Sequence, residues 1–304
     1  MPDEGAPAAP GRIEIRGLTK RFGGVCAVDH LDVTVTPGRV TAFLGPNGAG
    51  KTTTLRMLLG LVQPTSGTAT VDGAPYAQLS HPLRRVGALL EASDLHPARS
   101  GRDHLRVQAR AAGIDAHRVD EVLAQVGLTA DAGRRAGQYS LGMRQRLGLA
   151  AALLGDPGVL VLDEPANGLD PEGIRWLREL LRHYAQQGRT VLVSTHLLAE
   201  VQQIVDDVVV IARGRLLYAG TLAGLEQGAA PGVRVDSPDR PALLAALRAA
   251  HLHPRESADG VQVDDVTPAR VGALAFAARV ELHELVATGD SLEDVFLRLV
   301  ADAA

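Results

Sequence analysis

The chain has 304 residues, of which 46% are hydrophobic and 22% charged, and its net charge is −4 at pH 7. This length allows one large domain or two modest ones, and the slight excess of acidic residues gives no indication of a nucleic-acid partner. Cys26 is the only cysteine, so an internal disulfide framework is excluded and a reducing cytoplasm is favoured. The closest approach to a membrane-spanning run, 147–162, is interrupted by Gly155-Asp-Pro-Gly158, and we expect that the chain does not cross a membrane by itself.

The first part of the chain has the pattern of an α/β fold. Residues 1–11 are acidic and rich in proline, which predicts a disordered lead-in. Apolar patterning and turn residues predict strands at Ile13–Leu18, Val28–Val35, Val40–Leu44, Thr68–Val71 and Val86–Leu90. A turn is expected at 20–24 and a helix at 53–61.

From about residue 93 to 150 the pattern changes to helical spacing, at 103–112 and 119–126, which predicts a helical subdomain inserted into the α/β core. The core then resumes, and the whole of 12–220 is expected to form one domain. Its later elements are predicted at Val159–Leu162 (strand), Glu172–Gln187 (helix), Thr190–Ser194 (strand), Leu197–Val205 (helix), and Val208–Ile211 with Leu216–Ala219 (hairpin).

Beyond Gly220 a new alternation of strands and helices predicts a second, small α/β domain at 221–304. Its strands are expected at Val233–Asp236, Val261–Asp264 and Glu281–Val286, and its helices at Pro241–Ala250, Pro268–Ala278 and Leu292–Ala301. No catalytic constellation is visible in this domain. A dimer brace, a regulatory module and a partner contact all remain open as its role.

The loop after the strand 40–44 has the spacing G-x-x-x-x-G-K-[ST] of a phosphate-binding loop. Its glycines let successive backbone N–H groups face a phosphate chain, and the N-terminus of the following helix adds positive partial charge. Lys51 can reach the outer phosphates, and Thr52 is suited to ligate Mg²⁺. A nucleoside triphosphate is therefore predicted to bind at Gly45, Pro46, Asn47, Gly48, Ala49, Gly50, Lys51, Thr52 and Thr53.

Two adjacent carboxylates, Asp163 and Glu164, directly follow the all-apolar strand 159–162. In a doubly wound sheet the ligand lies at the carboxyl ends of the strands, so we expect this pair beside the phosphates. Asp163 is suited to holding Mg²⁺ through its water shell, and Glu164 to polarising the water that attacks the γ-phosphate. The alternative is a surface Asp-Glu pair in an ordinary turn.

The stretch 139–150 opens a helix with Ser140 in the capping position. Together with the motifs above, this stretch resembles the nucleotide-binding subunit of an ATP-binding cassette (ABC) transporter. In that family it is the signature motif, whose serine, glycine and helix N-terminus reach across a dimer to the γ-phosphate held by the other copy. Ser140 and Gly142 match that serine and the second glycine, whereas Leu141 and Met143 replace the usual first glycine and glutamine.

The resemblance also implies roles for three further positions. Phe22 matches the aromatic residue that stacks on adenine, with a buried phenylalanine that packs the sheet as the alternative. Asp170, in Gly168-Leu169-Asp170, matches the loop that contacts the opposite subunit. His196 matches the switch histidine beside the γ-phosphate, with a satisfied core histidine as the alternative.

Glu91 departs from the family, which usually carries at this position a glutamine that senses Mg²⁺, water and the transmembrane partner. A glutamate can still accept hydrogen bonds and ligate Mg²⁺, but it cannot donate, and it adds negative charge near a triphosphate. With the stretches 139–146, Asn167–Pro171 and Ser291–Phe296, it makes the chain similar to the export-type subgroup that serves antibiotic resistance and self-immunity.

The resemblance implies an α/β fold of the P-loop NTPase class, with an ABC-type nucleotide-binding domain, and an ATPase that powers an exporter of an antibiotic, drug or peptide. Two copies would sandwich ATP and Mg²⁺ at the cytoplasmic face of the membrane. They would drive separate integral-membrane permease subunits, which the segment after Glu91 and the helical subdomain would contact.

Two alternatives stand beside this interpretation. A soluble cassette ATPase acting on ribosomes or DNA is disfavoured by the single cassette, the lack of a heptad run and the net charge of −4, so no nucleic-acid partner is expected. A nucleotide-dependent regulator without turnover is disfavoured by the presence of Glu164 and His196, although Glu91 keeps it open. The transported molecule is not indicated by the sequence.

Overall fold

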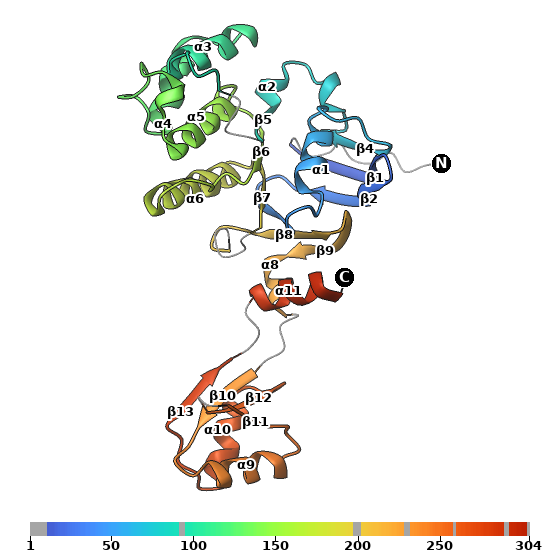
Figure 1. Cartoon of the computed structure of the whole chain (residues 1–304), viewed down its shortest axis with the longest axis vertical. Helices are drawn as coiled ribbons and strands as arrows, with labels where there is room; N and C mark the ends of the chain where they lie inside the picture. Colours follow the sequence, from blue (N-terminus) through green and yellow to red (C-terminus); the bar gives the residue numbers. More distant parts are fainter. Residues whose placement is uncertain are drawn as a thin grey trace. The chain divides into compact units, whose positions relative to one another are not determined.

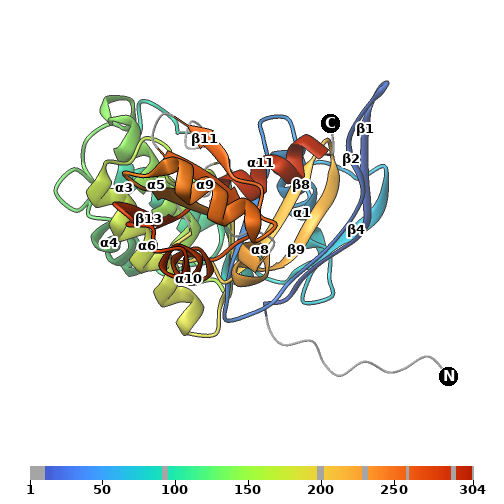
Figure 2. The ribbon, with the colours of Figure 1, turned by 90° about the horizontal axis from the view of Figure 1, so that it is seen from below.

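The computed structural model describes residues 11–90, 95–196, 202–227, 232–257, 260–288 and 292–302. They fall into two compact units, one up to Leu222 and a second at Ala223–Asp302 (Figures 1 and 2). Most of the predicted lead-in, 1–10, lies outside the described residues. Its last residue, Gly11, is buried, and its carbonyl accepts a hydrogen bond of 2.6 Å from Thr190 Oγ1. The prediction of disorder was therefore wrong at Gly11, because this residue is part of the packed unit.

A three-stranded antiparallel sheet begins the first unit. Its strands are β1 (Ile13–Phe22), β2 (Val25–Val35) and β4 (Ser66–Val71), in the order β2-β1-β4. The turn expected at 20–24 is shorter than predicted, because Phe22 still pairs with Val25. Only the two glycines between them are left to turn the chain, and Gly23 does so with a φ of +55°.

A six-stranded sheet forms the centre of the first unit. Its strands are β3 (Val40–Leu44), β5 (Val86–Leu89), β6 (Val159–Asp163), β7 (Thr190–Thr195), β8 (Asp207–Ala212) and β9 (Arg215–Thr221), in the order β5-β6-β7-β3-β8-β9. All neighbouring pairs are parallel except β8 and β9. Every residue of β3, β6 and β7 is buried, as expected of parallel strands covered on both faces. This confirms the predicted burial of the strands at 40–44 and 159–162. Because β5, β6, β7 and β3 are consecutive neighbours, their carboxyl ends meet at one edge.

The helices of the first unit lie on both sides of this sheet. They are α1 (Lys51–Leu58), α2 (Pro82–Arg85), α3 (Gly101–Ala111), α4 (His117–Gln125), α5 (Leu141–Leu153) and α6 (Pro171–Gln186), with short 3₁₀ turns at Tyr76–Gln78 and Ala136–Gln138. Figures 1 and 2 show α3, α4 and α5 grouped on one side and α1 beside the β1-β2-β4 sheet on the other. The predicted helical subdomain is thus present as three helices.

Most predicted helices begin and end within two residues of those in the structure, and two differ by more. The helix expected at 53–61 is α1, which begins at Lys51 and ends at Leu58. It starts earlier because Gly50 already provides the N-cap, and it ends earlier because Gly60 takes a φ of +70°. Of the helix expected at 197–205, residues 197–201 lie outside the described residues, and 202–204 form a turn.

The second unit has its own antiparallel sheet and its own apolar core. The sheet contains β10 (Gly232–Asp236), β11 (Arg255–Ser257), β12 (Gly260–Asp264) and β13 (Glu284–Ala287), in the order β11-β12-β10-β13. The helices are α8 (Leu222–Gln227), α9 (Arg240–Ala249), α10 (Pro268–Ala277) and α11 (Leu292–Asp302). Buried side chains of β10, β12, α9 and α10 form the core. β11 escaped prediction because its three residues are polar and exposed.

Candidate functional site

The loop between β3 and α1 is shaped by close backbone contacts at its glycines. A Cβ on Gly45 would lie 2.4 Å from the carbonyl oxygen of Ile211, and one on Gly50 would lie 2.5 Å from that of Ala27. Gly50 also takes a φ of +104°, which favours glycine. Between them, Asn47 and Gly48 are exposed at the tip, where a Cβ on Gly48 would meet nothing within 4 Å. The loop therefore leaves open space over its tip while its two ends are fixed.

The first turn of α1 leaves its backbone N–H groups without a side-chain acceptor. Its N-cap Gly50 makes no capping hydrogen bond, and the turn, which contains Thr52 and Thr53, holds no acidic residue. By contrast, Ser100, Ser140 and Asp170 cap α3, α5 and α6 with side-chain oxygens. An uncapped N-terminus with positive partial charge is suited to an anion such as a phosphate group.

Lys51 places a buried cation at the same point. Its side chain is 7% exposed, and its Nζ donates to the carbonyl oxygens of Gly45 at 2.6 Å and Pro46 at 3.4 Å. Burial lowers the pKa of Lys51, and the carboxylates of Glu164 and Asp163 act in the opposite direction. A desolvated ammonium group beside uncapped N–H groups fits a polyphosphate, whose negative charge would compensate for the water that the ammonium group loses on burial.

Asp163, at the end of β6, reaches the loop from the neighbouring part of the sheet. Its Oδ2 accepts a hydrogen bond of 2.6 Å from Thr52 Oγ1, and its Oδ1 accepts one from Ser194 Oγ on β7. This pairs a hydroxyl with a carboxylate, which are oxygen donors of the kind that Mg²⁺ prefers. A hydroxyl and a carboxylate fit an ion whose other ligands are phosphate oxygens and water. Within the described ranges, no three His, Cys, Asp or Glu side chains gather as a metal site.

Glu164 lies between the buried lysine and the histidine that follows β7. Both of its carboxylate oxygens are 3.0 Å from His196 Nδ1, and Oε1 is 3.9 Å from Lys51 Nζ. The side chains of Glu164 and His196 are 21% and 37% exposed, so both are accessible to water. His196 is thus not a satisfied core histidine, and the Asp-Glu pair is not in an ordinary surface turn. Strand order brings Lys51, Asp163, Glu164 and His196 together from β3, β6 and β7.

The predicted signature residues lie at the start of α5. Ser140 Oγ accepts a hydrogen bond of 3.2 Å from Met143 N and so caps the helix, as its position in the sequence indicated. In the described part of the chain, no hydrogen bond joins Ser140 or Gly142 to the phosphate-binding loop. Asp170 similarly caps α6, through a bond of 2.8 Å from Gly173 N. The roles of these residues toward a nucleotide stay predictions.

Two other predicted site residues have different outcomes. Phe22 is 50% exposed at the end of β1, with Lys20 Nζ 4.9 Å from its ring centroid. The alternative of a buried, sheet-packing phenylalanine was therefore wrong, because Phe22 sits at the solvent end of a hairpin. Glu91 lies outside the described residues, which stop at Leu90 before it.

Sequence reasoning missed two residues that hold the Asp163-Glu164 segment in place. Ser194 donates to Asp163, and its Oγ also accepts a hydrogen bond of 3.2 Å from Glu164 N. Gln145 on α5 donates from Nε2 to the carbonyl oxygen of Glu164 at 3.2 Å. Ser194 lies on β7, two residues before His196, so its place in the sequence could have indicated that it lies near the site. Gln145 had no such signal, because a glutamine in a helix is ordinarily exposed.

Comparison with known proteins gives matches in both units. A family model described as ABC transporter matches residues 28–167, and one described as a domain of unknown function matches 231–293. The bacitracin transport ATP-binding protein BcrA of Bacillus licheniformis is 44% identical over 208 residues, covering 67% of this chain and 68% of that protein. The Nod factor export ATP-binding protein I of Burkholderia lata is 37% identical over 302 residues, covering 96% and 97%.

Structural comparison gives the same result for the fold. A solved structure of the ATP-binding subunit of an ABC transporter matches with a TM-score of 0.65 at 28% identity, covering 71% of this chain and 92% of that chain. The predicted family and fold class are confirmed, and the ribosome- or DNA-acting alternative is not favoured. The chain belongs to the ATP-binding proteins of ABC transporters, which are ATPases that bind ATP and power transport.

Proposed function

We propose that this ATPase powers an exporter that removes an antibiotic, drug or peptide from the cell. The single observation that carries the ATPase part is the contact of Glu164 with His196 beside the buried Lys51. The export part is supported by the relatives, whose names record bacitracin transport and Nod factor export. A regulator without turnover would not need a carboxylate and an imidazole held together at the mouth of a phosphate-binding loop.

The residues of the site divide the work of hydrolysis. The loop N–H groups and Lys51 bind the phosphates, and Thr52 with Asp163 would hold Mg²⁺. Bound Mg²⁺-ATP supplies the phosphoanhydride bond and an electrophilic γ-phosphate. Glu164 orients a water molecule and accepts its proton at a carboxylate oxygen. His196 Nδ1, at 3.0 Å, fixes the direction of that carboxylate.

Among the described residues of one chain, no hydrogen bond joins the signature residues to the phosphate-binding loop. Ser140 and Gly142 begin a separate helix, and Leu141 between them is 61% exposed. We infer that a second copy brings these residues to the phosphates, so that two chains enclose two ATP molecules. The helix N-terminus of α5 then adds its partial positive charge at the γ-phosphate. Asp170 would lie near the partner in the same assembly, and Phe22 would stack on the adenine.

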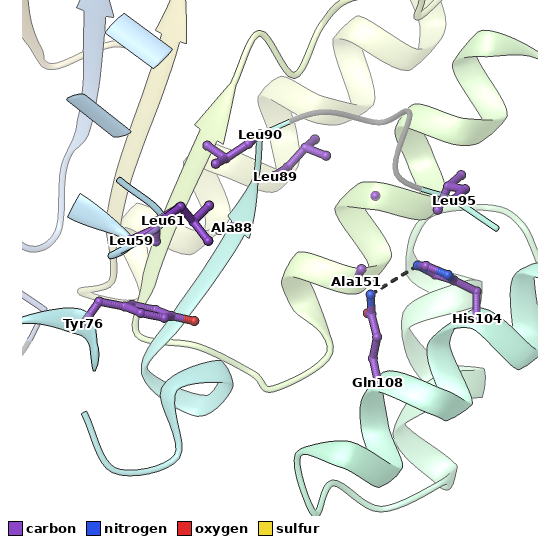
Figure 3. Close-up of a pocket in the computed structure, with 11 residues that line it drawn as sticks. Leu59, Leu61, Tyr76, Ala88, Leu89, Leu90, Leu95, His104, Gln108 and Ala151 are labelled. Atoms are coloured by element: carbon purple, nitrogen blue, oxygen red, sulfur yellow. Dashed lines mark hydrogen bonds between the residues drawn. The ribbon is translucent and has the colours of Figure 1, made fainter. Parts of the chain in front are cut away.

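A groove in the first unit supports coupling to a membrane subunit. It encloses about 280 Å³ and is lined mainly by apolar side chains: Leu59, Leu61, Tyr76, Ala88, Leu89, Leu90, Leu95, His104, Gln108, Gly148 and Ala151. Figure 3 shows Ala88 and Leu89 of β5 on one side and His104 and Gln108 of α3 on the other. Burial, reinforced by Arg99, lowers the pKa of His104. Its Nε2 lies 3.2 Å from Nε2 of Gln108. A mostly apolar groove of this kind fits a helix of a permease subunit.

The proposed location follows from that partner. In the described ranges, none of the helices combines the length and apolar character needed to span a bilayer. We propose that the chain is held peripherally at the cytoplasmic face of the cell membrane by permease subunits that bind this groove.

The substitution Glu164→Gln tests the proposed function. It keeps the shape of the side chain but removes the group that accepts the proton, so the steady-state ATPase rate should fall by about 100-fold or more. ATP affinity should stay within about twofold, because Lys51 and the loop are unchanged. ATPase assays with and without co-expressed permease subunits would show this. A variant that hydrolyses ATP at the wild-type rate would remove Glu164 from its role.

A further inference from the structure

The signature helix α5 is joined to the catalytic segment of its own chain by a buried glutamine. Gln145 is 4% exposed, and its Nε2 donates to the main-chain carbonyl oxygen of Glu164 at 3.2 Å. Only the Nε2 side of the amide can donate to a carbonyl, so the orientation of this amide is determined by chemistry. The bond therefore connects the helix that begins at Ser140 to the residue that activates water.

The backbone of Glu164 needs such support. Its φ is +47°, in the left-handed region that a residue with a Cβ seldom adopts. Its N–H donates to Ser194 O at 3.1 Å, and its carbonyl also accepts from Asn167 N at 3.2 Å. Gln145 supplies the second hydrogen bond to that carbonyl. The side chain of Glu164 is attached to this strained backbone. A small change in these hydrogen bonds would therefore redirect its carboxylate away from His196.

The other end of the same segment also packs against α5. A Cβ on Gly142 would lie 2.8 Å from the carbonyl oxygen of Gly168, and one on Gly168 would lie 2.4 Å from Leu141 Cγ. Gly168 has a φ of +77°. The segment from Glu164 to Asp170 thus meets the first turn of α5 near its end and Gln145, one turn later, at its beginning. A displacement of α5 would be transmitted to both places, since close backbone contacts leave no room to absorb it.

We propose that Gln145 is a positioning residue for hydrolysis, and that it links the signature helix to Glu164 within each chain. The inference rests on the proposed function, because it assumes that α5 meets a nucleotide held by the second copy. When that nucleotide arrives, α5 is fixed at its N-terminus, and Gln145 fixes the backbone of Glu164 in the conformation that directs its carboxylate. Occupancy of one composite site thereby prepares the carboxylate of the other.

The substitution Gln145→Met tests this role. Methionine has a similar length and fits a helix, but it cannot donate to the Glu164 carbonyl. We expect kcat to fall by about 10- to 100-fold, the range that corresponds to loss of a buried hydrogen bond. ATP affinity should stay within about twofold. In size-exclusion chromatography with ATP, Gln145→Met should accumulate as a dimer in the same way as Glu164→Gln, because α5 can still close on the nucleotide while hydrolysis is slow.

Two further variants keep the test decisive. Leu149→Met places the same new residue at another buried position of α5, and its kcat should stay within about twofold of wild type. Gln145→Glu retains the shape of the side chain but turns the donor into an acceptor, so its kcat should fall at least as far as that of Gln145→Met. If Gln145→Met is too unstable to purify, Gln145→Glu carries the same test.

The contradicting results are distinct from failure of the proposed function. A wild-type kcat in either Gln145 variant would overturn the inference. Loss of ATP-dependent dimers in Gln145→Met would also overturn it, because this is the result expected if Gln145 merely keeps α5 folded. If instead Glu164→Gln itself hydrolyses ATP normally, the proposed function has failed, and Gln145 no longer has a catalytic group to position.

Discussion

The two helices predicted to meet the phosphates, α1 and α5, begin in opposite ways. α1 follows an uncapped glycine, its first turn has no acidic residue, and a buried Lys51 lies beside it. α5 is capped by Ser140, and it presents an exposed Leu141 in its first turn. The first is an open anion site with its own cation, whereas the second is a capped helix end that makes no hydrogen bond to the phosphate-binding loop in the described part of the chain. A site shared between two copies would explain this difference between α1 and α5.

The largest effect should come from the α1 side. Lys51→Ala removes the only cation that contacts the loop carbonyls of Gly45 and Pro46 in the described structure. ATP affinity should fall by more than about 100-fold, because several charge-assisted hydrogen bonds to phosphate are lost together. Isothermal titration calorimetry measures this directly, with thermal unfolding as a check that the variant is folded. An unchanged affinity would contradict the assignment of the phosphate-binding loop.

The α5 side should respond differently. Ser140→Ala removes the cap of α5 together with the hydroxyl proposed to reach the partner's nucleotide. We expect kcat to fall by about tenfold or more while ATP affinity of the monomer stays within about twofold. Steady-state ATPase assays and calorimetry separate the two effects.

Ser100→Ala is the matched control for this prediction. Ser100 caps α3 through the same kind of bond, 3.1 Å from Asp103 N against 3.2 Å for Ser140 and Met143 N. Both variants should lose about 1 kcal/mol of stability through the lost cap, but Ser100→Ala should keep its kcat. Equal losses of kcat in the two variants would show that Ser140 acts only as a helix cap.

The smallest effect is expected at the adenine. Phe22→Ala should weaken ATP binding by about tenfold, because stacking of one base on an aromatic ring contributes about 1–3 kcal/mol. Phe276→Ala serves as the control, since Phe276 on α10 is 87% exposed and belongs to the second unit. Calorimetry with ATP and with inorganic triphosphate tests the assignment: the triphosphate should bind both variants equally. If Phe22→Ala binds ATP like wild type, Phe22 does not stack on adenine.

The sequence was sufficient where one local pattern determines one structure. The mostly apolar sequences of β3 and β6 predicted buried strands, and the serine before α5 predicted a capped helix. The motif spacing predicted Lys51, Asp163 and Glu164 at the ligand edge, because Lys51 follows the loop after β3 and the two carboxylates stand at the carboxyl end of β6.

The sequence was insufficient where distant segments meet. Neither the strand order β5-β6-β7-β3-β8-β9 nor the bond from Gln145 to the Glu164 carbonyl has a local signature. The exposure of Phe22 depends on the pairing of β1 with β2 up to the two-glycine turn. β11 is held as a strand by pairing with β12, although its three residues have no apolar pattern. In each case tertiary packing determines the structure. It acts between residues that are too far apart in the sequence for a periodic pattern to reveal the contact.

The central claim, that two chains complete each site, is tested most directly by the mass of the ATP-bound protein. In light scattering coupled to size-exclusion chromatography, Glu164→Gln with ATP should run at twice the 31.9 kDa mass of one chain. Adding Ser140→Ala to that variant should return it to a monomer that still binds ATP. A Glu164→Gln variant that remains a monomer while saturated with ATP would contradict the claim.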